Sequence, residues 1–316
     1  MKIVFDAICL GDGRVTGVAR SFLNGLHAYA ARYAADMIVL VPDGADHGEL
    51  PTVEIAAGPR GAVRRQRVLP RLLRDCNADL LHSSVASVPL RARCPTIATV
   101  HDLPWLHDES GERSNWWRRF ATTRALRAAA AVIAPSRFTL EAAAKILGDR
   151  SRLHHIPHTT RAPATIGDAR ERTGPLLVLG DDRPRKNRAR VRQAHRLARQ
   201  RVADLPELRF VGPPHDYVAE VEKERLLRTC RAVVACSLYE GFGMPVLEAL
   251  AHGAPLICSD IPPHREIAGA AARYVDPRDV ESIANGLIAE PVPHDGPMPG
   301  RPIAACWRSV HTLLLG

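Results

Sequence analysis

The sequence predicts an α/β protein made of two doubly wound domains with parallel sheets. Short β-branched segments alternate with longer amphipathic segments, the alternation is interrupted once, and polar or glycine-rich residues follow several of the predicted strands. Strands that are separated by helices form parallel sheets covered by helices on both faces. The chain has 316 residues, which is enough for two hydrophobic cores of ordinary size.

The order of the predicted elements places the domain boundary. In the first half the strand pattern covers residues 2–8, 37–41, 53–57, 79–83, 96–100, 131–134 and 152–156. After a stretch rich in Pro, Thr and Ala at residues 157–174, it covers residues 175–179, 208–211, 232–236, 255–259 and 273–275. Helical segments rich in Ala, Leu and Arg lie between the strands. We expect one domain at residues 1–160, a second at residues 161–302, and a C-terminal helix at residues 303–316 that packs back toward the first domain.

Unusual residues follow four of these strands, two in each half. A glycine-rich stretch at residues 11–17 follows the first strand, and His101 follows the strand at residues 96–100. In the second half, residues 181–187 and residues 239–241 occupy the corresponding places. Open parallel sheets bind ligands at the carboxyl ends of their strands. The sequence therefore predicts a ligand site in a cleft between two facing sheets.

The most informative segment is SLYEGFGMPVLEALAHGAPLICSD, at residues 237–260. Gly241 and Gly243 allow a tight turn. Pro245 suits the first turn of a helix, which we expect at residues 245–252. The N-terminus of such a helix combines unpaired N–H groups with the positive end of the helix dipole, so it is expected to bind an anion.

Two carboxylates flank this turn, Glu240 just before it and Glu248 inside the helix. The Glu-x7-Glu pair in YEGFGMPVLEALAHGAP resembles the signature of glycosyltransferase family 4, which has the GT-B fold. Further matching blocks lie at residues 100–103, 133–136, 183–187, 264–269 and 273–277, so the resemblance spans roughly residues 80–290 in the order of the family. It implies two Rossmann-like domains that face each other across a cleft.

The resemblance also implies roles for the residues of the second domain. Glu240 would contact hydroxyl groups of the donor sugar near the reacting carbon, and Glu248 would hold the ribose. The backbone amides of the turn would bind the sugar and the diphosphate. The residues of that turn are Gly241, Phe242, Gly243 and Met244.

Four more residues receive roles in the same way. Lys186, together with Arg185, would bind the diphosphate. His101 would face the donor sugar from the acceptor domain, and Gly17 would lie beside the phosphates. Glu240, His101 and Lys186 are the predicted catalytic residues, whereas His264 has no such assignment and is expected to be structural.

The family implies a retaining transfer of a hexosyl unit from a nucleotide-diphosphate sugar to a saccharide or a lipid-linked saccharide. Mannosyl, rhamnosyl and glucosyl units are the candidates, and cell-surface polysaccharide or lipopolysaccharide synthesis is the expected process. The chain contains no Asp-x-Asp metal motif. Fixed cations and helix N–H groups can stabilise the leaving diphosphate. We therefore expect no metal site and no cofactor beyond the nucleotide-sugar co-substrate.

The sequence departs from the family pattern at three places. Asp181, followed by Asp182, stands where the family often has an arginine, and these carboxylates would repel a diphosphate unless Arg183 or Arg185 neutralised them. The segment at residues 212–231 is short enough to lack a strand, which leaves the donor nucleotide open. At the linker, Pro157-His158-Thr159 replaces the usual Pro-Asn-Gly.

The composition restricts location and partners. Hydrophobic residues make up 46% of the chain without a run long enough to span a membrane, and the N-terminal residues fit a β-strand better than a signal peptide. A cytoplasmic protein is expected. The net charge is +9, and Trp116 and Trp117 lie beside arginines. These residues either contact an anionic membrane surface peripherally, on its inner face, or pack in the core of the first domain.

Two other functions stay open at this point. One is a catalytically silent GT-B subunit that serves a partner, for which Asp181 leaves room. The other is a basic RNA-binding protein, which only the net charge supports. Aromatic residues make up 5% of the chain and no nucleic-acid-binding module is visible, so no nucleic-acid partner is expected.

Overall fold

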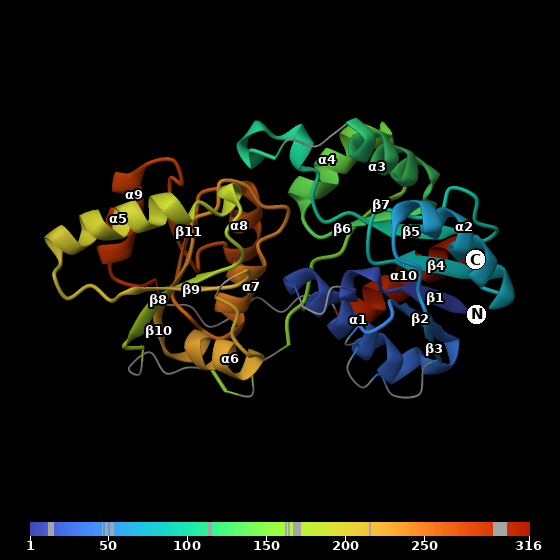
Figure 1. Ribbon diagram of the computed structural model, residues 1–316, viewed down its shortest axis with the longest axis horizontal. Coiled ribbons are helices and arrows are strands. Elements are labelled where there is room, and N and C mark those ends of the chain that lie inside the picture. Colours follow the sequence, from blue (N-terminus) through green and yellow to red (C-terminus); the bar gives the residue numbers. More distant parts are fainter. Residues whose placement is uncertain are drawn as a thin grey trace. The chain divides into compact units, whose positions relative to one another are not determined.

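The computed structural model describes residues 1–11, 16–45, 47, 50, 54–112, 116–161, 163, 165–166, 172–214, 216–292 and 302–316. The chain divides into two compact units. Unit 1 comprises Met1–Leu106, Arg113–Thr159 and Gly300–Gly316, and unit 2 comprises His107–Glu112 and Thr160–Pro299. Each unit is built on one parallel sheet with helices on both faces (Figure 1). The predicted fold class, two doubly wound α/β domains, is confirmed.

Unit 1 contains a seven-stranded sheet in the order β3-β2-β1-β4-β5-β6-β7. Its strands are β1 (Ile3–Asp6), β2 (Met37–Val41), β3 (Glu54–Ala57), β4 (Leu80–Ser83), β5 (Thr96–Thr99), β6 (Ala131–Ala134) and β7 (Leu153–His155). Ile3 of β1 is in register with Met37 on one side and with Leu80 on the other. The order of the strands reverses between β1 and β4, which makes their carboxyl ends the topological switch point of the unit.

Helices cover both faces of this sheet. They are α1 (Gly17–Tyr33), α2 (Ala62–Asp75), α3 (Trp116–Ala128), α4 (Arg137–Leu147) and α10 (Ile303–Leu315). Along β1, Ile3 and Phe5 pack on the face that α1 and α10 cover, whereas Val4 packs on the opposite face against α2. This alternation follows from the two-residue period of a strand. The helices α3 and α4 cover the rest of that opposite face.

Unit 2 contains a five-stranded parallel sheet in the order β12-β11-β10-β8-β9. The strands are β8 (Gly174–Leu179), β9 (Leu208–Val211), β10 (Cys230–Ala235), β11 (Leu256–Ser259) and β12 (Arg273–Val275). The helices are α5 (Arg188–Arg201), α6 (Glu220–Thr229), α7 (Met244–Ala251), α8 (Pro262–Ala268) and α9 (Val280–Ile288). One face packs against α5 and α9 and the other against α6, α7 and α8 (Figure 1).

The sheet of unit 2 ends at β9. Between β9 and α6, the described residues form only an isolated antiparallel bridge between Gly212 and Asp216. This agrees with the short segment noted at residues 212–231. The strand order again reverses beside β8, so the switch point of unit 2 lies between β8 and β10.

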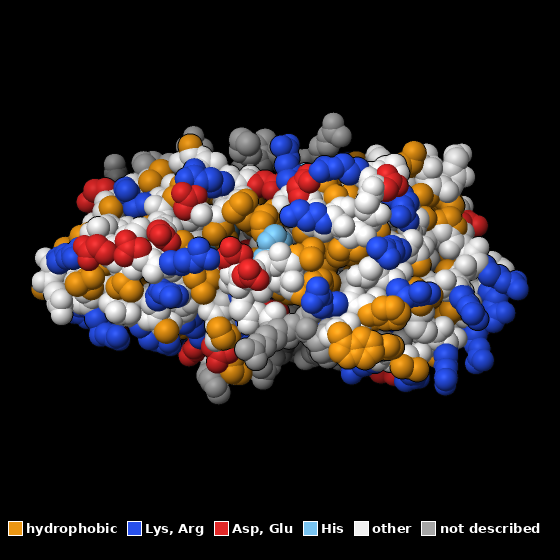
Figure 2. Space-filling model, turned by 90° about the horizontal axis from the view of Figure 1, so that it is seen from above, with side chains coloured by type: hydrophobic (Ala, Val, Ile, Leu, Met, Phe, Trp, Pro, Cys, Tyr) orange, Lys and Arg blue, Asp and Glu red, His pale blue; other side chains and the backbone are white. Residues whose placement is uncertain are grey.

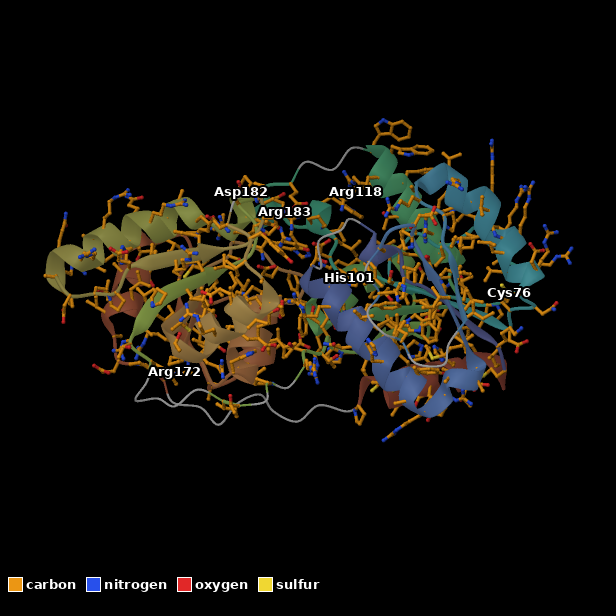
Figure 3. The ribbon with its side chains drawn as sticks, turned by 60° about the horizontal axis from the view of Figure 1, so that its bottom comes forward. Cys76, His101, Arg118, Arg172, Asp182 and Arg183 are labelled. Atoms are coloured by element: carbon orange, nitrogen blue, oxygen red, sulfur yellow. The ribbon has the colours of Figure 1, made fainter. Side chains whose placement is uncertain are left out.

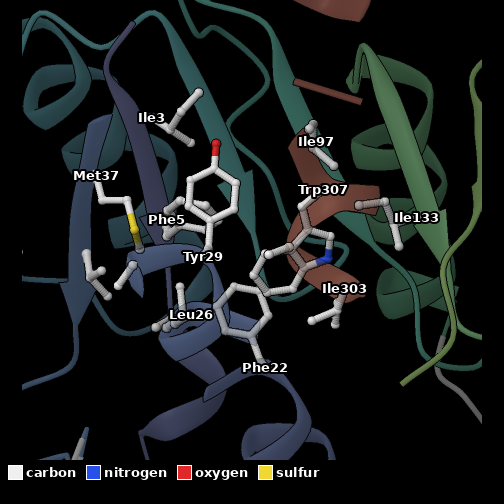
Figure 4. Packing of buried hydrophobic residues seen from close by; sticks show 14 of the residues in the cluster. Ile3, Phe5, Phe22, Leu26, Tyr29, Met37, Ile97, Ile133, Ile303 and Trp307 are labelled. Carbon is white, nitrogen blue, oxygen red and sulfur yellow. The ribbon is translucent and has the colours of Figure 1, made fainter. Parts of the chain in front are cut away.

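The C-terminal helix α10 completes the largest core of unit 1. Trp307 of α10 lies 5.2 Å from Phe22 and 5.7 Å from Phe5, measured between ring centroids (Figure 4). Gly25 of α1 faces the same indole ring, and a Cβ atom at this position would lie 2.2 Å from Trp307 Cη2. A residue with any side chain at position 25 would therefore prevent the two helices from packing as they do.

We predict that Gly25→Ala destabilises unit 1. An alanine inside a helix normally stabilises it by about 0.5–1 kcal/mol relative to glycine. Overpacking of a core costs about 1–3 kcal/mol, and the clash with Trp307 is severe, so the net effect should be a loss of about 1–2 kcal/mol in unfolding free energy. Urea unfolding measures this loss. The double variant Gly25→Ala/Trp307→Leu should lose less unfolding free energy than the sum of the losses in the two single variants. Strict additivity of the two losses would contradict the proposed contact.

Candidate functional site

The predicted donor-site residues of unit 2 follow two neighbouring strands. Beyond β8, a short 3₁₀-helix, η6 (Pro184–Lys186), carries Arg185 and Lys186. Beyond β10 the chain reaches Glu240, and α7 begins four residues later. Because β8 and β10 are adjacent and parallel, residues far apart in the sequence meet at the switch point.

The carboxylate of Glu240 is the centre of this site. Lys186 Nζ lies 2.6 Å from Glu240 Oε1, and Arg185 Nη1 donates a 3.0 Å hydrogen bond to Glu240 Oε2. The Ser237 hydroxyl donates to Oε1 at 2.7 Å. Glu240 is 7% exposed and Arg185 is 6% exposed. These three bonds use three of the roughly four acceptor positions of a carboxylate, so one position can still accept a hydroxyl group of a ligand.

Two opposing effects set the charge of Glu240. Burial acts to raise the pKa of its carboxyl group, whereas the positive charges of Lys186 and Arg185 act to lower it. The charges prevail and lower the pKa to about 2. Glu240 is therefore ionised at neutral pH, with two cations beside it.

Backbone contacts between the two loops hold these side chains in place. The Leu238 N–H donates to the Arg185 carbonyl at 2.8 Å. Asn187 adopts a left-handed conformation (φ 58°), and its Nδ2 donates to the carbonyls of Cys236 and Pro277 at 3.0 and 2.6 Å. Asn187 thus connects the loop after β8 to the loops after β10 and β12, a role that the sequence motif alone did not indicate.

The turn Gly241, Phe242, Gly243 and Met244 leads directly into α7, which begins one residue before the helix predicted at 245–252. Gly243 has φ +119°, and a Cβ atom there would lie 2.9 Å from His264 Cδ2. A glycine is therefore required at this position. The turn stands at the positive end of the α7 dipole, close to the cations beside Glu240.

His264, which we expect to be structural, packs against the turn of this site. It is buried, its Nδ1 lies 3.2 Å from the Ser259 carbonyl, and it packs against Gly243. Burial lowers its pKa to about 4, against the opposing effect of Glu240. His264 is therefore neutral at neutral pH. The only signal in the sequence was its position inside a block that matches the family.

Glu248 has a cation partner that the sequence did not reveal. It is 6% exposed, and Lys223 Nζ of α6 lies 3.0 Å from its Oε1. Lys223 also lies 3.0 Å from Glu220 of its own helix. No motif marks Lys223, so only the packing of α6 beside α7 identifies it.

In the loop after β8, Arg183 neutralises the carboxylate of Asp181. Arg183 donates to Asp181 Oδ2 from Nε at 2.9 Å and from Nη2 at 2.7 Å; Figure 3 shows Arg183 on this loop next to Asp182. Burial acts to raise the pKa of Asp181, but Arg183 lowers it. Glu112 in turn lies 3.1 Å from Arg185 and 3.3 Å from Arg183. The repulsion expected from Asp181 is thus offset by Arg183.

Gly17 and His101 belong to unit 1. Gly17 is the first residue of α1, after Thr16, whose hydroxyl accepts a hydrogen bond from the Ala19 N–H at 3.2 Å. Gly11 follows η1 (Ile8–Leu10), and the rest of the glycine-rich stretch, residues 12–15, lies outside the described residues. His101 follows β5 and is labelled in Figure 3.

Two family models match this chain. The one described as Glycosyltransferase Family 4 matches residues 15–160, and the one described as Glycosyl transferases group 1 matches residues 177–289. The chain belongs to glycosyltransferase family 4. The two matches lie one in each half of the chain, so membership of glycosyltransferase family 4 rests on most of the sequence.

Curated relatives of this family 4 protein include mannosyltransferases. The O-antigen chain mannosyltransferase B of Escherichia coli is 38% identical over 81 residues, which are 26% of this chain and 20% of the relative. The MMP alpha-(1->4)-mannosyltransferase of Mycolicibacterium hassiacum is 29% identical over 229 residues, covering 60% of this chain and 54% of the relative. The chain thus matches about half or less of the length of these proteins.

Solved structures establish the fold of this family 4 protein. The lipopolysaccharide outer core galactosyltransferase WaaB is 12% identical with a TM-score of 0.66, covering 99% of both chains. Anabaena HepE, solved in complex with UDP and glucose, is 18% identical with a TM-score of 0.64, covering 91% of this chain and 89% of HepE. The predicted GT-B fold is confirmed.

We predict a pH-dependent effect of Lys186→Met on stability. The pKa of Glu240 in the folded state, about 2, is below its ordinary value of 4.5, so the ionised carboxylate stabilises the folded protein above 4.5 and this contribution is lost as the pH falls toward 2. Lys186→Met removes the larger of the two cation effects and should raise this pKa. The difference in unfolding free energy between wild type and variant should be largest near neutral pH and shrink in acid.

Urea unfolding across this pH range measures the difference. Lys145→Met, at an exposed position of α4, is the matched control and should have a small effect that does not depend on pH. A difference for Lys186→Met that grows as the pH falls would contradict the assigned charge state of Glu240.

Proposed function

We propose that this protein is a retaining glycosyltransferase that transfers a hexosyl unit from a nucleoside-diphosphate sugar to a saccharide or lipid-linked saccharide. The observation that carries the proposal is the buried Glu240 carboxylate held by Lys186 and Arg185, beside the N-terminus of α7. Cations that lie beside helix N–H groups favour the binding of a diphosphate. A buried carboxylate that can accept hydrogen bonds favours the binding of sugar hydroxyl groups. Membership of family 4 supports the same reaction.

In the proposed reaction the bond between the sugar carbon and the diphosphate oxygen breaks, and a bond to the acceptor oxygen forms. Negative charge grows on the leaving diphosphate, where Lys186, Arg185 and the turn at residues 241–244 would stabilise it. Positive charge grows on the sugar, which the ionised Glu240 would stabilise. Glu248 would hold the ribose.

Without a covalent glycosyl-enzyme intermediate, retention requires that the acceptor attacks on the face from which the diphosphate leaves. We propose that the acceptor proton passes to the leaving phosphate oxygen, so that no protein nucleophile is needed. His101 would face the donor sugar, and Gly17 would lie beside the phosphates, as the family resemblance implies. These roles need no titrating base in unit 2, in keeping with the neutral His264 and the ionised Glu240.

The identity of the donor is also a proposal. The relatives named above include an O-antigen chain mannosyltransferase, which supports a mannosyl unit and a role in cell-surface polysaccharide or lipopolysaccharide synthesis. The UDP in the HepE structure supports a uridine nucleotide as one candidate for the donor nucleotide. Thermal shifts with UDP-, GDP- and ADP-sugars would distinguish them, because a ligand that binds the folded state raises its stability by mass action.

With the nucleotide sugar that the thermal-shift experiment identifies as the donor, we predict different kinetic effects of three substitutions. Lys186→Ala should lower kcat by about 10²–10³-fold, because its charge faces the growing charge of the diphosphate, and should also weaken donor binding. Glu240→Gln should lower kcat more than donor affinity, the pattern of an interaction made mainly in the transition state. Glu248→Ala should mainly raise the KM for the donor. Steady-state kinetics measure all three, with Lys145→Ala as the surface control.

A silent subunit would give the opposite result. If the protein only supported a partner, a variant carrying both Lys186→Ala and Glu240→Gln would still complement loss of the gene in cells, provided that it folds. Survival of complementation in this double variant would refute the catalytic proposal while leaving the fold and the family unaffected.

We further propose that transfer needs no divalent cation. Lys186, Arg185 and the N-terminus of α7 supply the positive charge that a metal ion would otherwise bring to the diphosphate. Turnover in EDTA should equal turnover in manganese. Activity that disappears in EDTA and returns with manganese would show this proposal to be wrong.

We also propose peripheral contact with an anionic membrane through α3. Trp116, Trp117 and Phe120 are 74%, 56% and 49% exposed, so they do not pack in the core, which was the alternative expectation. Arg119 and Arg124 of the same helix are exposed as well. Figure 2 shows Lys and Arg side chains interspersed with hydrophobic ones on one face of the molecule. In the residues that the structure describes, no helix has the length and apolar character needed to cross a bilayer.

The membrane proposal predicts that the protein floats with anionic liposomes. Aromatic side chains enter the interface, and each well-placed cation adds about 1 kcal/mol of attraction. Trp116→Ala combined with Trp117→Ala should reduce the bound fraction, whereas Tyr217→Ala, at a 57% exposed aromatic residue of unit 2, should not. Equal binding by all three proteins, or binding by none, would rule out α3 as the contact.

A further inference from the structure

Four polar groups form a continuous hydrogen-bonded chain at the carboxyl edge of the sheet of unit 1. Ser21 lies in the first turns of α1, Ser84 follows β4, His101 follows β5 and His158 follows β7. His101 Nε2 lies 2.7 Å from the Ser84 carbonyl oxygen, and His101 Nδ1 lies 3.2 Å from His158 Nε2. His158 Nδ1 lies 3.1 Å from the Ser21 hydroxyl. The Ser21 hydroxyl also accepts the Thr159 N–H at 2.9 Å.

Chemistry fixes the direction of the bonds to His101. A carbonyl oxygen can only accept, so Nε2 of His101 carries the proton and donates to Ser84. In a neutral imidazole the other nitrogen, Nδ1, then has a lone pair. His158 must donate its Nε2 proton to that lone pair, which leaves its own Nδ1 to accept from Ser21. Both nitrogens of His101 are thus occupied.

The surroundings keep both rings neutral and in one orientation. The two imidazoles are stacked, with ring centroids 5.1 Å apart and planes inclined by 23°. Burial lowers the pKa of both rings; Asp102 and the Ser84 carbonyl oppose this at His101, whereas His101 lowers the pKa of His158 further. The His101 carbonyl also accepts a 3.3 Å bond from the Thr139 hydroxyl.

We propose that His158 is a positioning residue, whose Nε2–H, aimed by Ser21, occupies Nδ1 of His101 and holds that ring neutral and fixed. The inference rests on the proposed role of His101 at the donor sugar. An imidazolium at that place would repel the positive charge that develops on the sugar. With both nitrogens occupied, His101 also does not compete with the leaving phosphate for the acceptor proton.

The proposal gives a reason for the departure at the linker. Asparagine, the residue usual in the family at this position, is too short to place a donor where imidazole Nε2 lies, whereas glutamine can both donate to His101 and accept from Ser21. His158→Gln should therefore still hold the ring of His101 in place. His158→Leu, which fills the space without polar atoms, should not. His154→Leu on β7 is the matched control, because His154 lies outside this chain of bonds.

Nitrogen-15 NMR of the free protein tests the positioning directly, with the His101 signals assigned from a His101→Gln variant. In wild type, Nδ1 should resonate as an unprotonated nitrogen and Nε2 as a protonated one. In His158→Leu, Nδ1 should take up a proton at higher pH than in wild type, whereas His158→Gln and His154→Leu should titrate like wild type. A His158→Leu protein in which His101 titrates as in wild type, or equal changes in the Leu and Gln variants, would overturn the proposal.

Kinetics then separate positioning from simple packing. His158→Leu should lower kcat by about tenfold with little change in the KM for the donor, the size expected for one lost hydrogen bond in the transition state. His158→Gln should restore most of the rate. Equal loss in both variants would show that the imidazole only fills space. If wild type transfers no sugar from any donor, the proposed function fails, yet the NMR result still decides whether His158 positions His101.

Discussion

The ion cluster of Glu240 with Lys186 and Arg185 is the interaction on which the site of unit 2 depends. Burial disfavours the ionised form of a carboxylate that is 7% exposed, and these cations outweigh that effect, while the carboxylate offsets the desolvation of the cations. Their meeting requires β8 and β10 to be neighbours and the loops beyond them to be tied together, which Asn187 achieves. The charge of the site therefore depends on the order of the strands in the sheet.

The charge of each titratable side chain at the strand ends depends on whether Coulomb attraction or the desolvation penalty is larger. Where an opposite charge is within contact, as at Glu240, Coulomb attraction exceeds the desolvation penalty and the group is ionised. At His101 and His158 desolvation prevails and the ring is neutral, although Asp102 opposes this at His101. At His264 the carboxylate of Glu240 lowers the effect of burial without reversing it. In the proposed reaction, this pattern places fixed positive charge at the phosphates and none at the sugar.

The two units obtain their stability in different ways. In unit 1 the final helix, α10, inserts Trp307 against Phe5 and Phe22 from the opposite end of the sequence. Its His311 bonds to Tyr29 and to His82, both at 3.0 Å, so a polar chain runs through the apolar core. In unit 2 the covering helices instead come from one contiguous stretch of sequence, with α5 and α9 on one face of the sheet and α6, α7 and α8 on the other. Loss of the last helix would therefore affect the unit that begins the chain.

The sequence by itself determined the class of fold and the family, because strand periodicity is local and the YEGFGMPVLE block is contiguous. Every predicted strand is present within about two residues of its predicted ends, as expected for boundaries read from patterns. The sequence could not identify the contacts that Lys223, His264, Asn187 and His158 make, because these contacts join segments that are distant in the chain. It also left Trp116 and Trp117 undecided between core and surface, since aromatic residues in a helix suit both. Only tertiary packing decided these points, because burial and pairing depend on which loops meet at the end of a sheet.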